Sequence, residues 1–247
     1  MNVIKIGGEV VEDLRVFEEF RVLLERKLPA AVVFGAGVQI SSRLKAEDIP
    51  FAFYKGERVT TAGMLLLIED EFKKMAKKIS SMLDGIESVF IPGSAVLTAA
   101  RKSDKLGFVG EIVSVDVSKI EASLVSPDEE PGAKVALVSP IAVSRAEDGP
   151  VSADAQGCKE LYNVNADVSA AMIAAGLGAE ELVYCTKVNG VNDSSENLIE
   201  KIDAAHAAEL ISSGVIEGGM IPKVKSALDS IKAGVGKVRI GRTVIMS

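Results

Sequence analysis

Two lysines and one aspartate stand where the sequence predicts that a buried strand meets a helix: Lys5, Asp167 and Lys223. Lys5 precedes a Gly-Gly pair, Asp167 follows the run Asn-Val-Asn-Ala, and Lys223 follows Gly-Gly-Met-Ile-Pro. Phosphoryl transfer needs groups of these types, because positioned positive charge neutralises phosphate oxygens and an acid can hold the lysines in place. The three residues therefore indicate phosphoryl-transfer chemistry.

The glycines beside these residues are suited to an anion site. Gly7 and Gly8 end a short apolar run, and glycines after a strand let backbone N–H groups approach an anion closely. The chain has no Gly-x-x-x-x-Gly-Lys-Ser/Thr motif, so it is not a P-loop enzyme, and Gly35-Ala36-Gly37 lacks the third glycine of a dinucleotide fingerprint. The single histidine, His206, lies away from every motif, which argues against a Ser-His-Asp hydrolase.

Strand and helix patterns alternate along the chain, and their order predicts the elements that position these residues. We expect buried strands at 2–6, 30–34, 89–91, 134–139, 181–186 and 237–240, an extended segment at 51–59 and a hairpin strand at 107–115. We expect helices at 11–27, 38–45, 62–83, 118–124, 167–177, 203–213 and 220–233. This alternation predicts an α/β fold whose mostly parallel sheet is covered on both faces, with ligands bound beyond the carboxyl ends of the strands.

Composition narrows the class of protein further. The chain has 247 residues, of which 48% are hydrophobic, enough for a large globular core. Its net charge of −7 argues against a nucleic-acid partner. Cys158 and Cys185 have no metal-ligand spacing, so we expect no protein-bound metal site. No apolar run is long enough for a signal peptide or a membrane span, and we expect a cytoplasmic protein without membrane contact.

Six segments, in order along nearly the whole chain, carry a resemblance to a known family. They are residues 4–8, 32–37, 56–60, 107–110, 162–167 and 218–223. The set resembles the amino-acid kinase family, and within it the acetylglutamate kinases. The resemblance implies a three-layer α-β-α sandwich of the amino-acid kinase or carbamate kinase type. It also implies one continuous fold with two lobes, in which residues 1–166 bind the acceptor acid and residues 167–247 bind the nucleotide.

The resemblance assigns roles to individual residues. Lys5 and Lys223 would flank the transferred phosphoryl group, and Asp167 would orient both lysines. The acceptor would be bound by six residues, namely Gly35, Ala36, Gly37, Arg58, Asn163 and Asn165. The nucleotide would be bound by nine residues, namely Gly7, Gly8, Thr186, Lys187, Val188, Gly190, Val215, Gly219 and Met220. Among these, Arg58 would pair with a substrate carboxylate, because its planar fork suits that geometry.

The reaction that the resemblance implies is ATP-dependent phosphorylation of the side-chain carboxylate of N-acetyl-L-glutamate, a step of arginine biosynthesis. A carboxylate acceptor needs no general base, which agrees with the lack of a histidine near the motifs. Magnesium would be held largely by the nucleotide phosphates. The resemblance also implies a homodimer, because subunits of acetylglutamate kinases commonly join through a long helix such as the one expected at 62–83.

Three of the site residues also have a purely structural interpretation. Asp167 alone is a good helix N-cap, Arg58 in an exposed extended segment is compatible with simple solvation, and Lys223 is compatible with a first-turn helix lysine. The last position is mildly disfavoured by the helix dipole, which indicates that another force placed Lys223 there.

The resemblance leaves two alternatives to a kinase that acts on a free acid. In the first, the acceptor is aminoadipate or glutamate attached to a small acidic carrier protein, and Lys45, Lys55 and Arg58 would line the mouth of the pocket. In the second, the chain is a non-catalytic member of the family that only binds a ligand. Two departures motivate it: Ala36 replaces a glycine of the usual second glycine motif, and Lys187 replaces an acid at a strand end.

Overall fold

The central feature of the fold is a sheet of eight strands, seen in a computed structural model that describes residues 1–124, 134–145, 160–218 and 220–246. The strand order is β12-β14-β13-β11-β1-β2-β8-β5. Their bounds are β1 (Asn2–Ile6), β2 (Ala30–Phe34), β5 (Glu87–Ile91), β8 (Lys134–Val138), β11 (Glu181–Cys185), β12 (Lys201–Ile202), β13 (Lys237–Ile240) and β14 (Thr243–Ile245). All neighbouring strands run parallel except β13 and β14, which run antiparallel.

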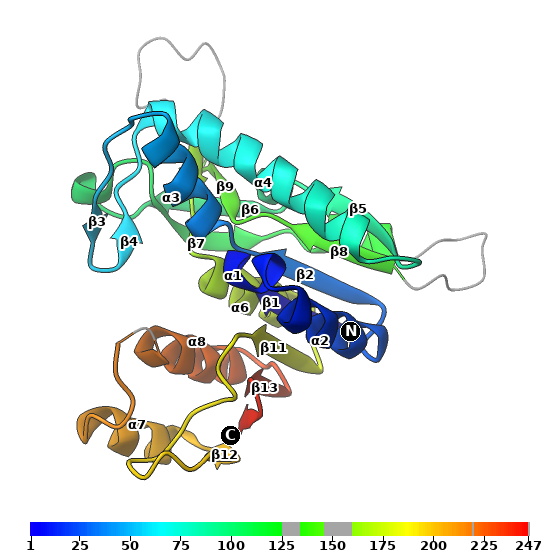
Figure 1. Ribbon diagram of the computed structural model, residues 1–247, viewed down its shortest axis with the longest axis vertical. Helices are drawn as coiled ribbons and strands as arrows, with labels where there is room; N and C mark the ends of the chain where they lie inside the picture. The colour runs from blue at the N-terminus through cyan, green and yellow to red at the C-terminus, as the bar shows by residue number, and fades with distance from the viewer. Residues whose placement is uncertain (125–133, 146–159, 219, 247) are drawn as a thin grey trace.

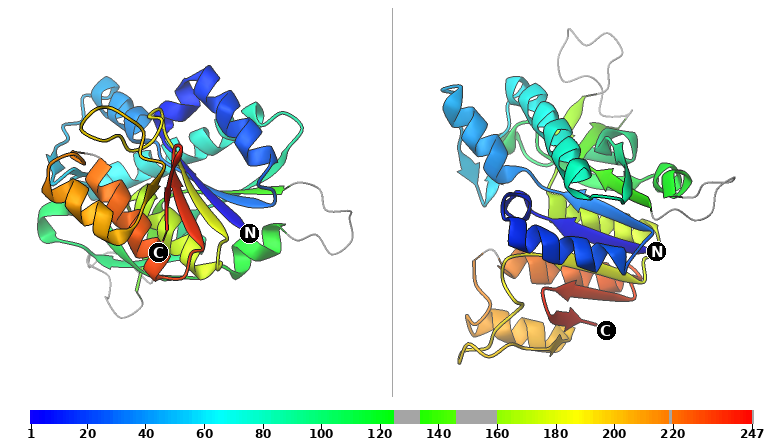
Figure 2. Two further views of the ribbon diagram at one scale, coloured as in Figure 1. Left: turned by 90° about the horizontal axis from the view of Figure 1, so that it is seen from below. Right: turned by 45° about the vertical axis from the view of Figure 1, so that its right-hand side comes forward.

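Helices cover both faces of this sheet, as Figure 1 and Figure 2 show. One face packs against α1 (Gly8–Glu12), α2 (Leu14–Glu25), α3 (Gly37–Ala46) and α4 (Ala62–Met82). The other packs against α5 (Ser118–Leu124), α6 (Ala166–Gly176), α7 (Ala204–Ser212) and α8 (Met220–Lys232). The alternation of strand β1 explains this division, because Ile4 and Ile6 belong to the first hydrophobic core and Val3 belongs to the second.

Two smaller sheets complete the structure. A four-stranded sheet has the order β10-β9-β6-β7, formed by β6 (Leu97–Arg101), β7 (Gly110–Val115), β9 (Ile141–Ser144) and β10 (Leu161–Asn163). A short hairpin is formed by β3 (Phe53–Tyr54) and β4 (Glu57–Arg58). Single turns of 3-10 helix lie at Gly93–Ala95 and Asp104–Leu106.

The structure confirms the predicted α/β class, the three layers and the mostly parallel sheet. The helix predicted at 11–27 is wrong as a single element, because it divides at Asp13 into α1 and α2. The Asp13 side chain accepts a hydrogen bond from the backbone N–H of Val16 at 3.3 Å and so begins a new helix. Leu14, the first residue of α2, is 77% exposed. The segment 51–59, predicted to be extended, contains the two short strands of the β3–β4 hairpin.

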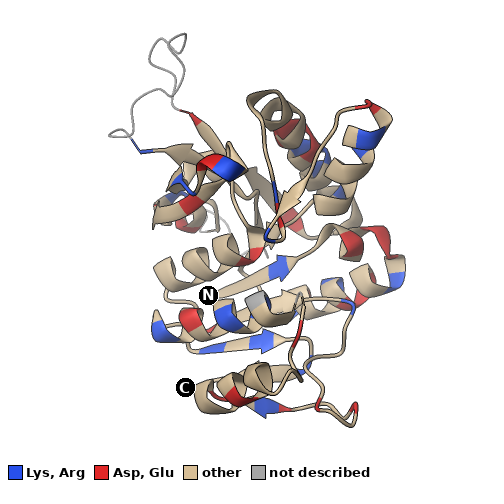
Figure 3. Ribbon diagram, turned by 90° about the vertical axis from the view of Figure 1, so that its left-hand side faces the viewer, with Lys and Arg blue, Asp and Glu red and all other residues tan. Residues whose placement is uncertain are grey.

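Charged residues of both signs are spread over the helices and strands in the view of Figure 3. Among the helices of the described residues, none has both the length and the apolar content that a membrane span requires.

Candidate active site

Three strands of the central sheet end at one edge. Ile6 of β1 pairs in register with Phe34 of β2 on one side and with Cys185 of β11 on the other. The segments that follow these strands therefore start side by side. This is the edge at which a mostly parallel α/β sheet binds its ligands.

A lysine–aspartate cluster, formed by Lys5, Asp167 and Lys223, lies at this edge. Lys5 Nζ is 2.9 Å from Asp167 Oδ1, and Lys223 Nζ is 3.0 Å from Asp167 Oδ2. The side chains are only 10%, 17% and 22% exposed for Lys5, Asp167 and Lys223. Lys5 comes from the middle of the sheet, Asp167 from the first turn of α6 and Lys223 from the first turn of α8. The fold thus brings together the three residues that the sequence singled out.

The charge of Asp167 is maintained by its two lysines. Burial of the carboxylate raises its pKa, but attraction to Lys5 and to Lys223 lowers it more, so the pKa of Asp167 lies below its ordinary value. The cluster therefore contains two ammonium groups and one carboxylate at neutral pH. The net charge of the cluster is positive, and its side chains are largely shielded from water. Both properties favour binding of an anion such as a phosphate.

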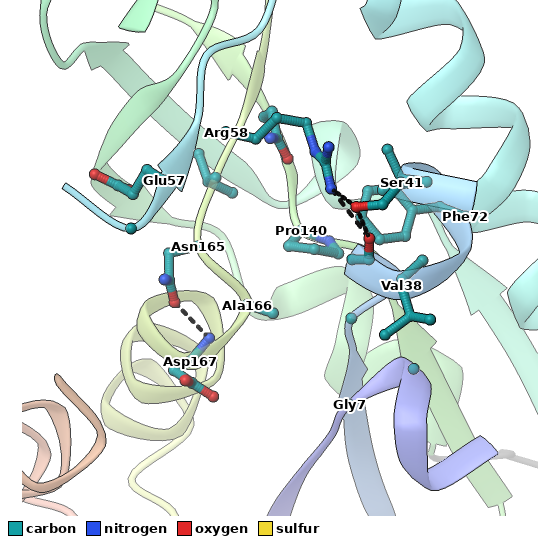
Figure 4. Close-up of a pocket in the computed structure, with 18 of the residues that line it drawn as sticks. Gly7, Val38, Ser41, Glu57, Arg58, Phe72, Pro140, Asn165, Ala166 and Asp167 are labelled. Atoms are coloured by element: carbon teal, nitrogen blue, oxygen red, sulfur yellow. Dashed lines mark hydrogen bonds between the residues drawn. The ribbon is translucent and has the colours of Figure 1, made fainter. Parts of the chain in front are cut away.

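Asn165, and not Asp167, is the N-cap of α6, so the structural interpretation of Asp167 as a cap is wrong. Asn165 Oδ1 accepts a hydrogen bond from the backbone N–H of Asp167 at 2.8 Å (Figure 4). It accepts a second one from the backbone N–H of Val168 at 3.2 Å. The cap holds the backbone of Asp167, and the Asp167 carboxylate is left free to bind the lysines.

Removal of this cap has a measurable cost. We expect Asn165→Ala to lower the free energy of unfolding by about 1 kcal/mol, the usual cost of losing an N-cap side chain. Urea unfolding followed by circular dichroism measures it. Asp203→Ala is a matched comparison, since Asp203 caps α7 through the backbone N–H of His206 at 2.8 Å. A stability of Asn165→Ala equal to that of the unmodified protein, with Asp203→Ala destabilised, would show that the Asn165 cap has no net effect.

A cavity of about 640 Å³ opens beside the lysine–aspartate cluster. Its lining includes Lys5, Asp167 and most of the predicted acceptor and phosphate residues, which are Gly7, Gly8, Gly35, Ala36, Gly37, Arg58, Asn163 and Asn165. In Figure 4, Arg58 and Asp167 approach this cavity from opposite sides. The volume is adequate for a small organic ligand.

The second glycine motif leaves open space on the cavity side. A Cβ on Gly37 would meet no atom within 4 Å, and one on Gly35 would meet only ordinary contacts. The packing of the chain does not require glycine at these two positions, whereas close approach of a ligand to the backbone would. Ala36 is buried with φ −131° and ψ 29°, so its methyl group is accommodated without a left-handed backbone.

Arg58 is buried, which corrects the interpretation of a solvated side chain. Its Nη2 donates hydrogen bonds to the carbonyl oxygen of Gly37 at 3.0 Å and to Ser41 Oγ at 2.6 Å. The guanidinium carbon lies 4.8 Å and 4.9 Å from the ring centroids of Phe51 and Phe53. Burial lowers the pKa of Arg58, but a guanidinium stays charged in proteins.

One donor of Arg58 remains without a partner. Nη1 is buried and forms no hydrogen bond within the described part of the chain. An unpaired buried donor is costly, and a carboxylate bound in the cavity would remove that cost. Asn163, on the same wall, donates through Nδ2 to Thr60 Oγ1 at 3.3 Å.

Tyr184 is a site residue that the sequence pattern did not reveal. It lies beside Lys5 in the sheet register, and its hydroxyl donates to the carbonyl oxygen of Asp167 at 3.3 Å. The same hydroxyl lies 3.0 Å from Ser226 Oγ of α8, and the ring centroid lies 5.9 Å from Lys223 Nζ. Tyr184 therefore ties α6 to α8 at the cluster. The only sequence signal was its place in the strand that adjoins Lys5.

The other predicted nucleotide residues do not line this cavity. Thr186, Lys187 and Val188 follow β11, and Lys187 Nζ pairs with Asp13 Oδ2 at 3.1 Å. Gly190 is buried and packs closely against Thr243 and Leu198. Val215 and Met220 contact the hydrophobic core on the α8 face of the sheet.

Two positions named in the sequence analysis, Gly219 and Cys158, lie outside the described residues. Cys185 is partly buried, and burial raises the pKa of its thiol to about 11, which agrees with a small apolar residue and not a reactive one.

Known proteins are similar to this chain in sequence. The chain is 32% identical over 244 residues to the acetylglutamate kinase of Bacillus cereus, covering 96% of this chain and 88% of that protein. It is 33% identical over 248 residues to the acetylglutamate kinase of Campylobacter fetus, covering 96% of this chain and 82% of that protein.

Solved structures share the fold. The protein smu.665 of Streptococcus mutans superposes with a TM-score of 0.80 at 25% identity, covering 99% of this chain and 98% of that chain. Carbamate kinase of Giardia lamblia, solved with AMP-PNP, superposes with a TM-score of 0.70 at 14% identity, covering 100% of this chain and 98% of that chain. The second likeness concerns the fold alone.

The family itself is recognised over almost the full length. Residues 1–242 match the amino acid kinase family, and all three members of the lysine–aspartate cluster fall within that range. The relatives are kinases, and kinase chemistry agrees with a positively charged cluster beside a cavity. The chain therefore belongs to the amino acid kinase family.

Proposed function

We propose that this kinase transfers the γ-phosphoryl group of ATP to the side-chain carboxylate of N-acetyl-L-glutamate and forms an acyl phosphate. The observation that carries the proposal is the lysine–aspartate cluster at the edge of a cavity whose opposite wall holds Arg58. The identity of about a third to acetylglutamate kinases over most of both chains supports this acceptor. Arginine biosynthesis would be the corresponding pathway.

The proposed reaction is a direct in-line transfer. A carboxylate oxygen of the acid attacks the γ-phosphorus, and the bond from this phosphorus to the oxygen bridging to the β-phosphate breaks with its electron pair leaving on ADP. The attacking carboxylate is already deprotonated at neutral pH, so no general base is required. Lys5 and Lys223 would neutralise charge on the transferred phosphoryl oxygens, and Asp167 would keep both ammonium groups in place.

The acceptor would lie between the cluster and Arg58. Its α-carboxylate would accept hydrogen bonds from Arg58, including one from the unpaired Nη1. The backbone N–H groups of the Gly35-Ala36-Gly37 segment would contact the reacting end. Apolar groups that also line the cavity, Val38 and Phe72, would contact the acyl group.

Arg58 gives the first functional prediction. We expect Arg58→Lys to raise KM for the acid by about 10- to 100-fold with a smaller change in KM for ATP, because a lysine keeps the charge but loses the planar fork. Steady-state kinetics with each substrate varied in turn measures this. Arg21→Lys is the matched control, because Arg21 lies on α2 outside the cavity lining and pairs with Glu18. A rise confined to KM for ATP would mean that Arg58 does not bind the acceptor.

A carrier-linked acceptor is the second candidate, and one feature of the cavity rim favours it. The exposed Lys45 lines the cavity, and the Nζ atoms of Lys55 and Lys105 lie 5.7 Å and 5.6 Å from the ring centroid of Tyr54 on the β3–β4 hairpin. These cations would attract a small acidic carrier protein. A non-catalytic role is less favoured, because the complete cluster is present.

The two lobes and the homodimer belong to the same proposal. Residues 1–166 would bind the acceptor and residues 167–247 the nucleotide, including the segments 186–190 and 215–220. A second copy would cover the exposed Leu66 of α4 and the exposed Val89 of the edge strand β5, two apolar residues that water otherwise contacts.

A panel of acceptors tests the proposed substrate. Magnesium-ATP turnover would be measured as ADP release with N-acetylglutamate, N-acetylaminoadipate, glutamate, aspartate and a carrier-linked glutamate. We expect kcat/KM to be highest for N-acetylglutamate, by at least about 10-fold over acids that differ by one methylene or lack the acyl group. Turnover with the carrier-linked acid alone would replace the first candidate by the second. Nucleotide binding without turnover on any acid would indicate a non-catalytic protein.

A further inference from the structure

The cavity contains one carboxylate that the proposed reaction leaves unused. Three acidic residues line it: Glu9, Glu57 and Asp167. Asp167 is held by the two lysines of the cluster, and Glu57 Oε2 is 2.8 Å from Nζ of Lys102. Glu9 forms neither an ion pair nor a hydrogen bond with any other described residue. Within the described part of the chain, no cation therefore pairs with its negative charge.

The Glu9 side chain folds back over the Gly7-Gly8 turn. A Cβ on Gly7 would collide with the Glu9 carboxylate, and a Cβ on Gly8 would collide with the side-chain oxygen of Gln39. Gln39 Nε2 donates to the carbonyl oxygen of Gly8 at 3.1 Å, whereas Gln39 Oε1 is buried and has no partner among the described residues. Two oxygen acceptors thus cover the glycines to which we assign the nucleotide phosphates.

A carboxylate and a phosphate that approach the same two glycines repel one another unless a cation lies between them. Kinases receive such a cation with their nucleotide, because magnesium in these sites is bound by one or two carboxylates together with substrate phosphates and water. An oxygen-only set of protein donors, such as Glu9 and Gln39, is the set that magnesium prefers. The residues at the Gly7-Gly8 turn therefore fit this ion.

We propose that Glu9 is a ligand of the magnesium ion that accompanies the nucleotide. This inference rests on the proposed function only in requiring that the site binds a magnesium nucleotide; it does not depend on the identity of the acceptor. Lys5 and Lys223 would then compensate the charge of the transferred phosphoryl group, and the Glu9-bound ion would compensate the charge of the remaining phosphates. The magnesium site would be completed by the nucleotide and water.

Binding of ADP with and without magnesium tests the inference without any turnover. Calorimetric titrations would compare the unmodified protein and Glu9→Gln, each in magnesium buffer and in EDTA. We expect magnesium to tighten ADP binding in the unmodified protein, and Glu9→Gln to reduce that gain by about 10-fold, the usual cost of disturbing a metal ligand or its partners. The metal-free affinity of Glu9→Gln should be unchanged or higher, because a negative charge has been removed beside the phosphates. Manganese electron paramagnetic resonance in the ADP complex provides a second readout.

Glu19→Gln is the control. Glu19 lies on the neighbouring helix α2, its carboxylate pairs with Arg15 at 3.5 Å, and it does not line the cavity. We expect its magnesium gain to equal that of the unmodified protein. If Glu9→Gln raised the affinity for ADP by the same factor with and without magnesium, Glu9 would only occlude the turn. If Glu9→Gln left both the affinity and its gain from magnesium unchanged, Glu9 would not contact the ion. Either result overturns the inference.

Failure of the proposed function gives different results. An unmodified protein that binds no ADP in either buffer would contradict both proposals. Normal ADP binding with a Glu9-dependent magnesium gain, but no phosphorylation of any acid, would contradict only the proposed acceptor.

Discussion

Replacement of Lys223 by alanine should reduce kcat by about 1,000-fold, the scale reported for loss of one charge-stabilising donor in a transition state. The reason is geometric. Lys223 Nζ is held at 3.0 Å from Asp167 Oδ2, and Asp167 lines the cavity, so we expect the charge of Lys223 to act on phosphoryl oxygens bound there. KM for ATP should change much less, because the lysine would act mainly on charge that develops during transfer.

Lys225→Ala is the control for this variant. Lys225 lies two residues further along α8 on its exposed side, so the substitution has the same chemistry without touching the cluster. Its kcat should remain within about twofold of the unmodified enzyme, since surface substitutions rarely alter the fold. A Lys223→Ala enzyme with kcat close to that of Lys225→Ala would show that Lys223 does not take part in the reaction.

Asp167→Asn should lower kcat by about 100-fold while leaving the affinity for ATP unchanged or increased, because the lysines lose their orientation but the site gains net positive charge. This pairing of effects distinguishes an orienting carboxylate from one that binds nucleotide. Competition between ATP and a fluorescent nucleotide measures the affinity, and steady-state kinetics measures kcat. Weaker ATP binding together with an unchanged kcat would contradict the assigned role. Asp229→Asn, with an exposed carboxylate on α8, is the control.

The stability that Asp167→Asn loses relative to the unmodified protein should depend on pH. The pKa of Asp167 lies below its unfolded value of about 3.8, although burial alone would raise it, because Lys5 and Lys223 attract the carboxylate more strongly. A lowered pKa stabilises the folded state above the unfolded value, and that stabilisation disappears as the pH falls through the folded pKa. Asp167→Asn should therefore be less stable at pH 7, by about 3 kcal/mol as for other broken buried ion pairs, with the difference shrinking below pH 4. A difference that grows under acid conditions would contradict this sign.

The layers of the fold are largely predictable because they follow from apolar patterning. The buried runs 2–6, 30–34 and 237–240 and the helix 118–124 form at the predicted bounds, since each pairs a clear period with a nearby turn signal. The strands that were not predicted are β6, β9, β10, β12 and β14, which have two to five residues. Such short runs show little periodicity, and their pairing depends on side-chain packing, so local patterns contain little information about them.

Helix starts were harder to predict because several residues compete for the same cap. Asn165 and Asp167 are both good N-cap residues, and only the fold shows that Asn165 accepts the first-turn N–H groups. Asp13 acts in the same way within a continuous helical pattern and divides it. Propensity alone does not rank such neighbours.

The site was predictable where motifs carried it and not where packing did. Lys5, Asp167 and Lys223 meet as expected. The burial of Arg58 between Phe51 and Phe53, and the position of Tyr184 under the cluster, arise from tertiary contacts that leave no local pattern. Glu9 differs from the other acids around the cavity only in its tertiary contacts, which the sequence does not indicate.

The most direct test of the account is chemical trapping of the product. The enzyme would be incubated with magnesium-ATP, N-acetylglutamate and hydroxylamine, which converts an acyl phosphate to a stable hydroxamate that mass spectrometry identifies. The proposed reaction gives one N-acetylglutamyl hydroxamate for each ADP released, and both products should be lost in Lys223→Ala. Release of ADP without a hydroxamate from any acid in the panel, or hydroxamate formation that survives in Lys223→Ala, would contradict it.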